Sequence, residues 1–255
     1  MSKLGYWSIH QYHRLSVEEW VEEWVGWPAM LDLVRLAREE FGSREEAFLT
    51  TLFLTGGRVS EALPLKRENF WIHRKEGVII VKGMPLLKRY RKIEEYVDEE
   101  GKRRWKTEPL FKRRKPFPIL LEEPLTPILL KWLEKHPSGL LFPSPYRTGK
   151  PLTRFWAYRM IRRLDQEIPH ELRRRLNLIQ WEPGKRANRL HLWPHWFRAQ
   201  RASCLVEEYD FRLHHLLEYF SWENLETARR YARRGWRGLA ELMRGIRIPD
   251  LEEAE

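Results

Sequence analysis

Toward its C-terminal end the chain crowds arginine around one tyrosine. The segment ETARRYARRGW, residues 226–236, sets Tyr231 beside Arg229, Arg230, Arg233 and Arg234. A free phenol titrates at about pH 10 and is a poor nucleophile at neutrality, but neighbouring cations favour the phenolate. Arginine also binds phosphate oxygens through two parallel N–H donors. The pattern predicts either a phenol that attacks a phosphate or a solvated basic helix face, and the other motifs decide between them.

Motifs for other kinds of phosphate chemistry are missing from the sequence. There is no GxxxxGK[ST] loop, so ATP is not implied. The histidines lack the HExxH or Cys/His spacing of a zinc site, and no set of acidic residues stands out to hold magnesium. Each lone histidine otherwise reads as a hydrogen-bonded surface or core residue. The sequence therefore implies no cofactor and no metal, which leaves phosphoryl transfer by side chains alone.

Five segments occur in an order that resembles the catalytic domain of the tyrosine recombinases, the phage-integrase family of Xer- and Cre-type enzymes. They are LTGGRVSEAL (54–63), VIIVKG (78–83), LFPSPYRTGKPLT (141–153), PHWFR (194–198) and FSWENLETARRY (220–231). The first resembles the family's TGxRxxEL box, the second its lysine-bearing hairpin strand, and the fourth its HxxR box. In the last, Trp222 stands nine residues before Tyr231, as a His or Trp does before the nucleophile in the family.

The resemblance implies six catalytic residues and one supporting acid, namely Arg58, Lys82, His195, Arg198, Trp222 and Tyr231, with Glu61. Two guanidiniums, Arg58 and Arg198, can bind the charge of a phosphodiester transition state in place of a metal ion. Glu61 lies one helical turn beyond Arg58 and could orient its guanidinium. Lys82 is the favoured acid for the leaving 5′ oxygen, and His195 would accept a proton or donate a hydrogen bond at the phosphate.

Some positions depart from the family's usual residues. Ala199 follows the second-box arginine where a histidine is frequent, and Ser221-Trp222 replaces a usual Gly-His. An indole only donates a hydrogen bond, so Trp222 would position and pack rather than transfer protons. Type IB topoisomerases share the fold and chemistry, but usually carry Lys in place of the second-box His and His in place of Trp222. A topoisomerase-like relaxing enzyme is one alternative, and a DNA-binding module of the same fold without activity is another.

The composition favours a polyanionic partner. The chain of 255 residues has a net charge of +11 and a pI of about 9.8, a balance that usually accompanies nucleic-acid binding. It has no run of about 18 apolar residues, no apolar signal segment, and a single cysteine, Cys204. We therefore expect a cytoplasmic protein, nucleoid-associated when active, with no membrane partner. Its 33% of charged residues with few Asn and Gln is also common in archaeal and other thermophile proteins.

Mainly helical elements would carry these residues. Capping boxes at Ser16–Glu19 and Ser43–Glu46 predict helix starts, and Pro28 suits the first turn of a helix between them. Gly56-Gly57 breaks the helix that precedes Arg58. Further helices are expected over 126–136, after a Thr153 cap, over 195–209 and over 210–220. The prediction is a mainly helical α+β fold with a small antiparallel sheet, the fold of DNA breaking-rejoining enzymes.

Two β segments, EGVIIVKG and KPFPILL, flank a long basic stretch that we expect to form a hairpin with its turn at 98–101. Its Lys and Arg side chains could be edge-strand charges that block aggregation, or they could bind DNA. Lys88, Arg89 and Arg91 are the candidate DNA contacts here, and Arg229 and Arg230 are candidates beside the nucleophile.

Residues 1–235 are expected to form one catalytic domain, without the separate N-terminal helical domain that completes the family's clamp around DNA. Either the chain is a fragment or it is a minimal enzyme. The remainder, 236–255, should hold a short amphipathic helix with Leu239, Leu242, Met243 and Ile246 on one face. That helix could pack on its own core or dock on a neighbouring subunit.

The resemblance implies a site-specific recombinase or integrase that cleaves and rejoins double-stranded DNA through a 3′-phosphotyrosyl intermediate. It also implies self-association, as a tetramer on DNA and a monomer or weak oligomer when free.

Overall fold

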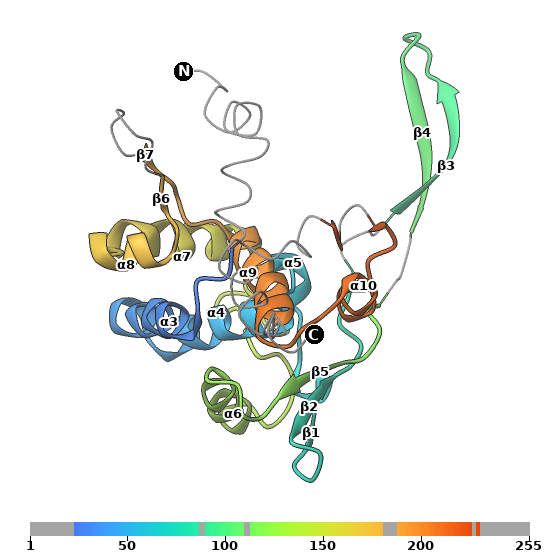
Figure 1. The fold of residues 1–255 in the computed structure, drawn as a ribbon. Coiled ribbons are helices and arrows are strands. Elements are labelled where there is room, and N and C mark those ends of the chain that lie inside the picture. The colour runs from blue at the N-terminus through green and yellow to red at the C-terminus, as the bar shows by residue number, and fades with distance from the viewer. Residues whose placement is uncertain (1–22, 87–89, 110–112, 181–187, 226–227, 230–255) are drawn as a thin grey trace, which may run out of the picture.

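A computed structural model describes residues 23–86, 90–109, 113–180, 188–225 and 228–229. The described chain is mainly helical with a small antiparallel sheet, as the sequence predicts (Figure 1). The expected capping box at Ser16–Glu19 and the expected helix near Leu239 lie outside the described residues. No described helix is both long enough and apolar enough to cross a bilayer.

Helices α3 (Trp27–Phe41) and α4 (Ser43–Thr55) pack side by side and supply much of the core. The four α4 residues expected in the core, Ala47, Phe48, Leu52 and Phe53, are all buried. The predicted capping box at Ser43 is wrong: the helix begins at Ser43 itself, and its N-cap residue, Gly42, has no side chain to accept a hydrogen bond. The Glu46 amide instead donates to the Gly42 carbonyl, and the Glu46 carboxylate pairs with Arg38.

Helix α4 ends where the sequence predicts, at two glycines. Gly56 is left-handed with φ of +55°, and its amide closes the helix on the Phe53 carbonyl. Glycine adopts this conformation without the steric cost that a side chain would add. The short helix α5 (Val59–Ala62) follows at once, so Arg58 stands at its N-cap.

The central sheet has the order β1–β2–β5, with strands β1 (Phe70–His73), β2 (Val78–Val81) and β5 (Phe117–Leu120) antiparallel. Val81 lies opposite Phe70 on one side and Phe117 on the other. Strands β2 and β5 are the expected pair. Strand β1, which follows the 3₁₀ turn η1 (Arg67–Asn69), was not expected, because four residues with one buried aromatic give no clear alternation.

Strands β3 (Tyr90–Val97) and β4 (Arg103–Pro109) form the expected long hairpin, which projects from the body (Figure 1). The turn forms at 98–101, where the Asp98 amide bonds the Lys102 carbonyl and Gly101 has φ of +74°. These strands and their turn are not basic overall, because residues 90–109 hold six Lys/Arg and six Asp/Glu. In the sequence, the charge surplus lies instead in the KR and KRRK runs at 88–89 and 112–115, which flank these strands.

The rest of the described chain is helical apart from one small strand pair. Helix α6 (Thr126–Lys135) packs on α4, and α7 (Arg154–Glu167) begins at the predicted Thr153 cap, whose hydroxyl accepts from the Trp156 amide at 3.1 Å. The segment expected only to connect contains α8 (His170–Arg175) and the strands β6 (Ile179–Gln180) and β7 (Asn188–Arg189). Helices α9 (Pro194–Glu207) and α10 (Leu213–Phe220) complete it.

Candidate active site

Arg58 and Glu61 form the first part of the site. The Arg58 guanidinium donates to Glu61 Oε1 at 2.8 Å, and the Arg58 backbone amide donates to Glu61 Oε2 at 2.9 Å. The carboxylate thereby caps the first turn of α5 and orients the guanidinium. The Glu61 side chain is 1% exposed, while that of Arg58 is 38% exposed. The Arg58 guanidinium is therefore fixed by the buried Glu61 carboxylate, while part of the side chain remains exposed to solvent.

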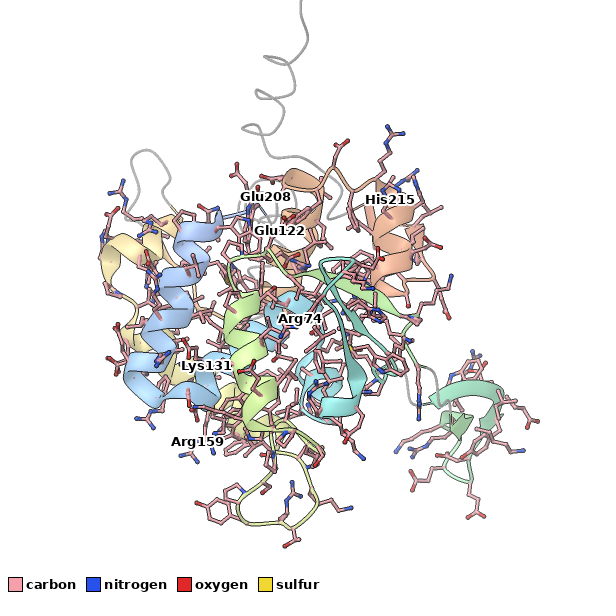
Figure 2. All side chains as sticks on the ribbon, turned by 90° about the horizontal axis from the view of Figure 1, so that it is seen from below. Arg74, Glu122, Lys131, Arg159, Glu208 and His215 are labelled. Atoms are coloured by element: carbon pink, nitrogen blue, oxygen red, sulfur yellow. The ribbon has the colours of Figure 1, made fainter. Side chains whose placement is uncertain are left out.

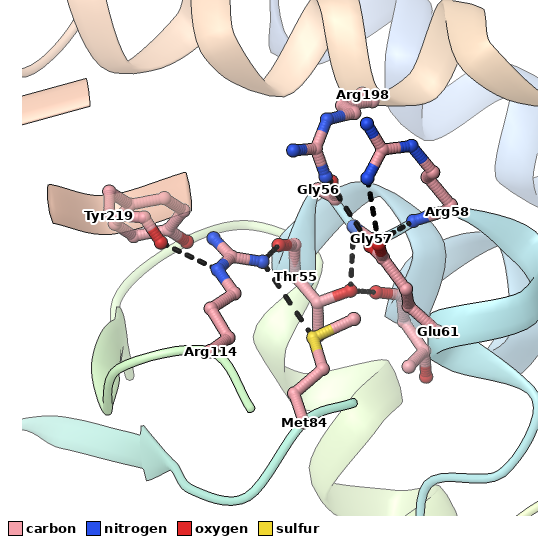
Figure 3. Close-up of polar contacts among 10 residues, drawn as sticks. Thr55, Gly56, Gly57, Arg58, Glu61, Met84, Arg114, Arg198 and Tyr219 are labelled. Atoms are coloured by element: carbon pink, nitrogen blue, oxygen red, sulfur yellow. Dashed lines mark hydrogen bonds and ion pairs between the residues drawn. The ribbon is translucent and has the colours of Figure 1, made fainter. Parts of the chain in front are cut away.

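Arg198 comes from α9 to the same carboxylate. Its Nη1 donates to the Gly56 carbonyl at 2.7 Å and lies 3.5 Å from Glu61 Oε2. The Arg198 side chain is 2% exposed. Residues far apart in the sequence thus place two guanidiniums on one buried carboxylate, as Figure 3 shows.

The charge of Glu61 is maintained by these neighbours. Burial by itself raises the pKa of a carboxyl, but Arg198, the Arg58 amide and the Arg58 guanidinium together hold the pKa of Glu61 below its usual value. Glu61 is therefore ionised at neutral pH. Because it neutralises one of two adjacent cations, the pair of arginines keeps a net positive charge that suits a phosphate group.

The glycine pair allows the close packing of this turn. A Cβ on Gly56 would lie 2.4 Å from Phe220, and one on Gly57 would lie 2.2 Å from the Met84 methyl group. Gly57 also donates its amide to the Thr55 hydroxyl at 3.2 Å. A side chain at Gly56 would push Phe220 and α10 away from the Arg58 turn, whereas one at Gly57 would displace the Met84 methyl group.

Trp222 lies beside Arg198. Its ring stacks on Phe220 at a centroid distance of 4.4 Å, with an interplanar angle of 11°. The Arg198 guanidinium carbon lies 4.8 Å from the Phe220 ring centre and 5.3 Å from that of Trp222. The indole thus packs on Phe220 and Arg198, and its positioning role stays a prediction.

Lys82 directly follows β2. No described contact links its ammonium to Arg58 or Arg198. Nζ lies 3.7 Å from the ring centre of Trp71 on β1. The backbone is held firmly, since the Lys82 amide donates to the Asn69 carbonyl and the Asn69 side chain donates to the Lys82 carbonyl. The structure therefore places the Lys82 side chain against Trp71 on the neighbouring strand β1.

His195 is exposed in the first turn of α9, three residues before Arg198 and so close to the same side of the helix. A buried carboxylate that the sequence did not indicate fixes the approach to this turn. Asp165 on α7 accepts from the Leu192 amide, from His191 Nδ1 at 2.9 Å and from Arg173 at 2.8 Å. An isolated Asp within a helix carries no sequence signal for such a role.

Tyr231, Arg230, Lys88 and Arg89 lie outside the described residues, as does the side chain of Arg91. Arg229 is described and exposed. Tyr219 on α10 is a described tyrosine near the site, and it is poorly suited to be a nucleophile. Its hydroxyl donates to the Leu54 carbonyl at 2.9 Å and accepts from Arg201, and burial raises its pKa.

One exposed basic surface was not predicted. The outer face of α7 carries the exposed side chains Arg154, Phe155, Tyr158, Arg159, Arg162 and Arg163. Arg159 lies 5.8 Å from the Phe155 ring, and Figure 2 shows it on the outer edge of the molecule. Arginines interleaved with aromatic rings are typical of nucleic-acid surfaces. For this helix the sequence predicted only the start at Thr153.

On the hairpin, the described cations are mostly paired with its own carboxylates. Lys106 lies 2.8 Å from Glu94, and Arg104 lies 2.7 Å from Asp98. In the described parts of the chain, no cluster of three or more His, Cys, Asp or Glu side chains could hold a metal ion.

Comparisons with known proteins bear on the family and the fold of the chain. The sequence profile described as the Phage integrase family matches residues 29–235. Among solved structures, the chain is similar to the XerA recombinase (TM-score 0.52, 17% identity, covering 88% of this chain and 66% of that one). It is similar to the XerH recombinase on palindromic difH substrate (0.52, 16% identity, 88% and 53%). It is also similar to the Tn1549 transposon integrase in complex with transposon right end DNA (0.53, 15% identity, 88% and 66%).

At these identities the structures establish a shared fold, and the chain spans between about half and two thirds of the length of each of these proteins. No curated protein sequence matches the chain. The family profile covers most of the sequence, including the Arg58 turn, Lys82, α9 and Trp222. The chain therefore belongs to the phage integrase family.

Proposed function

We propose that this protein cleaves and rejoins DNA strands through a covalent 3′-phosphotyrosyl intermediate, without a metal ion or ATP, in site-specific recombination or integration. The observation that carries the proposal is the placement of Arg58 and Arg198 on the single buried carboxylate of Glu61. Two preorganised guanidiniums with one compensating charge form a site for a phosphodiester whose negative charge grows in the transition state.

The proposed chemistry begins with the Tyr231 phenol. Its oxygen attacks phosphorus, the bond from phosphorus to the 5′ oxygen breaks, and the tyrosine becomes esterified to the 3′ phosphate. Lys82 gives a proton to the departing 5′ oxygen, and His195 takes or shares a proton at the phosphate side. Attack by a free 5′ hydroxyl reverses these steps and releases the phenol. The ester retains the energy of the broken bond, which is why no ATP is required.

Positive surfaces support DNA as the substrate. The net charge of +11 is not spread evenly, since residues 90–109 are balanced whereas the hairpin base and the outer face of α7 are basic. Lys88, Arg89 and Arg91 at the hairpin base and Arg229 and Arg230 beside the nucleophile are the proposed phosphate contacts. Such contacts provide affinity and orientation rather than sequence reading.

Recombination needs two duplexes, so we propose a tetramer on DNA and a monomer or weak oligomer without it. Among the similar structures, the XerH recombinase is bound to palindromic difH substrate and the Tn1549 integrase is in complex with transposon right end DNA. The proposal also includes the C-terminal segment 236–255, whose apolar stripe would dock on a neighbouring subunit. A chain that ends at Gly235 should then stay folded and bind DNA but lose coordinated strand exchange. Unfolding of that truncated monomer at ambient temperature would show that the segment belongs to its own core.

The decisive experiment is covalent trapping. A nicked suicide duplex, which loses the short fragment that carries the free 5′ hydroxyl after cleavage, should give a protein–DNA adduct on a denaturing gel, with the same yield in EDTA. Cleavage that disappears in EDTA and returns with magnesium would overturn the metal-free mechanism. A supercoiled plasmid without a recombination site separates the topoisomerase alternative, because efficient relaxation by catalytic amounts of protein would favour that enzyme. The target sequence can be sought by selecting adduct-forming duplexes from a randomised pool.

A further inference from the structure

A second buried arginine, Arg114, joins the segments that carry the proposed catalytic residues. It lies at the C-terminal base of the β3–β4 hairpin and is 3% exposed. Its Nε donates to the Tyr219 carbonyl at 2.6 Å, and its Nη1 donates to the Thr55 carbonyl at 2.5 Å. Its guanidinium carbon stacks 3.7 Å from the centre of the Phe117 ring on β5 (Figure 3 shows its polar contacts).

Both carbonyls belong to helix C-termini. Thr55 is the last residue of α4, and Tyr219 is the last but one of α10. The final carbonyls of a helix have no partner within it and carry the negative end of the helix dipole. One guanidinium thus caps two helices together. Gly56-Gly57-Arg58 follows the first of these helix ends, and Ser221-Trp222 follows the second.

The same region also holds the chain after Lys82. The Arg114 amide donates to the Met84 carbonyl at 2.8 Å, and Nη1 lies 3.7 Å from the Met84 sulfur. The Met84 methyl group packs on Gly57, next to Arg58. The following residue adds another link, because the Lys115 amide donates to the Ser221 hydroxyl at 2.9 Å.

Simple space filling does not account for an arginine here. The hydrogen-bond partners of the Arg114 side chain are two carbonyls and the Met84 sulfur, all uncharged. Burial lowers its pKa to about 9, so it enters the core as a charge that burial disfavours. Methionine would fill similar space beside Phe117 without this cost. What arginine adds is a rigid fork of donors that can bind two helix ends at a fixed separation.

We propose that Arg114 is a positioning residue for strand cleavage: by capping α4 and α10 together, it aligns the Arg58 turn, the Lys82–Met84 segment and the Trp222 segment. The inference rests on the proposed function. The alignment matters because a small displacement of a catalytic group lowers the reaction rate strongly while it changes the affinity for DNA little. Arg114 itself touches no reacting atom.

The test compares Arg114→Met with Arg114→Lys in single-turnover cleavage of a suicide duplex at saturating protein. We expect Arg114→Met to lower the rate constant for adduct formation by about 10- to 100-fold. DNA affinity should change by less than about threefold, because phosphate contacts lie elsewhere. Arg114→Lys, which keeps a cationic donor, should recover part of the rate. A wild-type rate constant for Arg114→Met would overturn the proposal.

A control separates positioning from loss of stability. Leu133→Ala removes a buried side chain from α6, away from the site. It should lower the melting temperature at least as much as Arg114→Met does. Below both melting temperatures it should cleave at the wild-type rate. An equal rate loss in Leu133→Ala would show that general destabilisation explains the Arg114 result and would reject the positioning role.

Hydrogen exchange provides a readout that does not depend on activity. In Arg114→Met, amides of 216–222 and 55–58 should exchange faster, while those of α6 should not change. Unchanged exchange at the two helix ends in a folded variant would contradict the capping role. If Arg114→Met fails to fold, Met84→Ala is the second variant, because it removes the side chain that contacts both Arg114 and Gly57. Met84→Ala should lower the cleavage rate while DNA affinity changes little. Cleavage at the wild-type rate by Met84→Ala would overturn the inference. If the wild-type protein forms no adduct, the proposed function has failed, whereas the exchange result still decides whether Arg114 caps the two helices.

Discussion

The ammonium of Lys82 lies over the indole ring of Trp71, with Nζ 3.7 Å from the ring centre. Trp71 is 52% exposed, and its own N–H donates to the Glu68 carbonyl, which fixes the ring. A cation–π contact at such a site is worth about 0.5–1 kcal/mol. Lys82, the general acid proposed for the leaving oxygen, is therefore held against Trp71 only weakly. An ion pair with a phosphate group would stabilise its ammonium by more than this cation–π contact does.

Replacing Lys82 and Trp71 should have opposite effects. Lys82→Ala should slow cleavage by about 10²-fold or more, as loss of a general acid does. Trp71→Leu should speed cleavage by about two- to fivefold, the factor that corresponds to the lost cation–π contact. A duplex with sulfur in place of the bridging 5′ oxygen should restore cleavage by Lys82→Ala, because a thiolate leaves without a proton. Failure of that substrate to rescue Lys82→Ala would remove Lys82 from the acid role.

Two tyrosine variants separate the nucleophile from a structural phenol. Tyr231→Phe should abolish the covalent adduct and leave DNA binding nearly intact, because only the attacking oxygen is lost. Tyr219→Phe should lower the free energy of unfolding by about 1–3 kcal/mol, since it leaves buried partners of the hydroxyl unsatisfied. It should nevertheless form the adduct. An adduct that survives in Tyr231→Phe would point to a different nucleophile.

Arg58 and Arg198 should be separable by stability. Either change to alanine should slow cleavage by about 10²-fold or more, the usual cost of losing a preorganised charge donor. Arg198→Ala should also destabilise the fold by about 3–5 kcal/mol, because it breaks a buried pair. Arg58 is partly exposed, so Arg58→Ala should cost less stability. Thermal melts alongside single-turnover cleavage test this, and equal stability losses would contradict it.

Glu61 should make stability depend on pH in a defined direction. Its folded-state pKa is below the unfolded value, so its contribution is fully present above about pH 4.5 and is lost as pH falls through the folded pKa. At pH 7, Glu61→Gln should lower the free energy of unfolding by about 3 kcal/mol relative to wild type, because the buried Arg198 loses the counter-ion that Glu61 provides. Denaturant titrations should show this difference shrinking below about pH 4. A difference that stays constant with pH would disprove the assignment.

The hairpin base should bind DNA and its distal half should not. Changing Lys88, Arg89 and Arg91 to Ala should weaken binding and reduce the log–log salt slope by about 0.9 for each lost phosphate contact. The matched control changes Lys102, Arg104 and Lys106 to Ala, three cations that pair with hairpin carboxylates. That control should leave the slope unchanged. A reversed outcome would place the DNA contact at the hairpin tip.

Much of the local structure follows from the order of residue types. Helix α4, its end at Gly56-Gly57, the Thr153 cap and the turn at 98–101 are short-range features, and the sequence predicted each of them. The family resemblance likewise depends on residues a few positions apart, such as Arg58 and Glu61. Short-range hydrogen bonds and backbone preferences decide such features, and both are encoded by near neighbours.

Only the tertiary structure showed which distant residues share one carboxylate or one cap. Glu61 meets Arg198, and Arg114 meets Thr55 and Tyr219, through packing that brings α4, α9 and α10 together. Nothing near Arg114 in the sequence distinguishes it from the exposed Arg113 and Lys115 on either side. Alternation along the chain at the hairpin base turns one cation of that run into the core. The burial of each cationic side chain, and the groups packed around it, then decide whether it is solvated, contacts DNA or caps two helix ends.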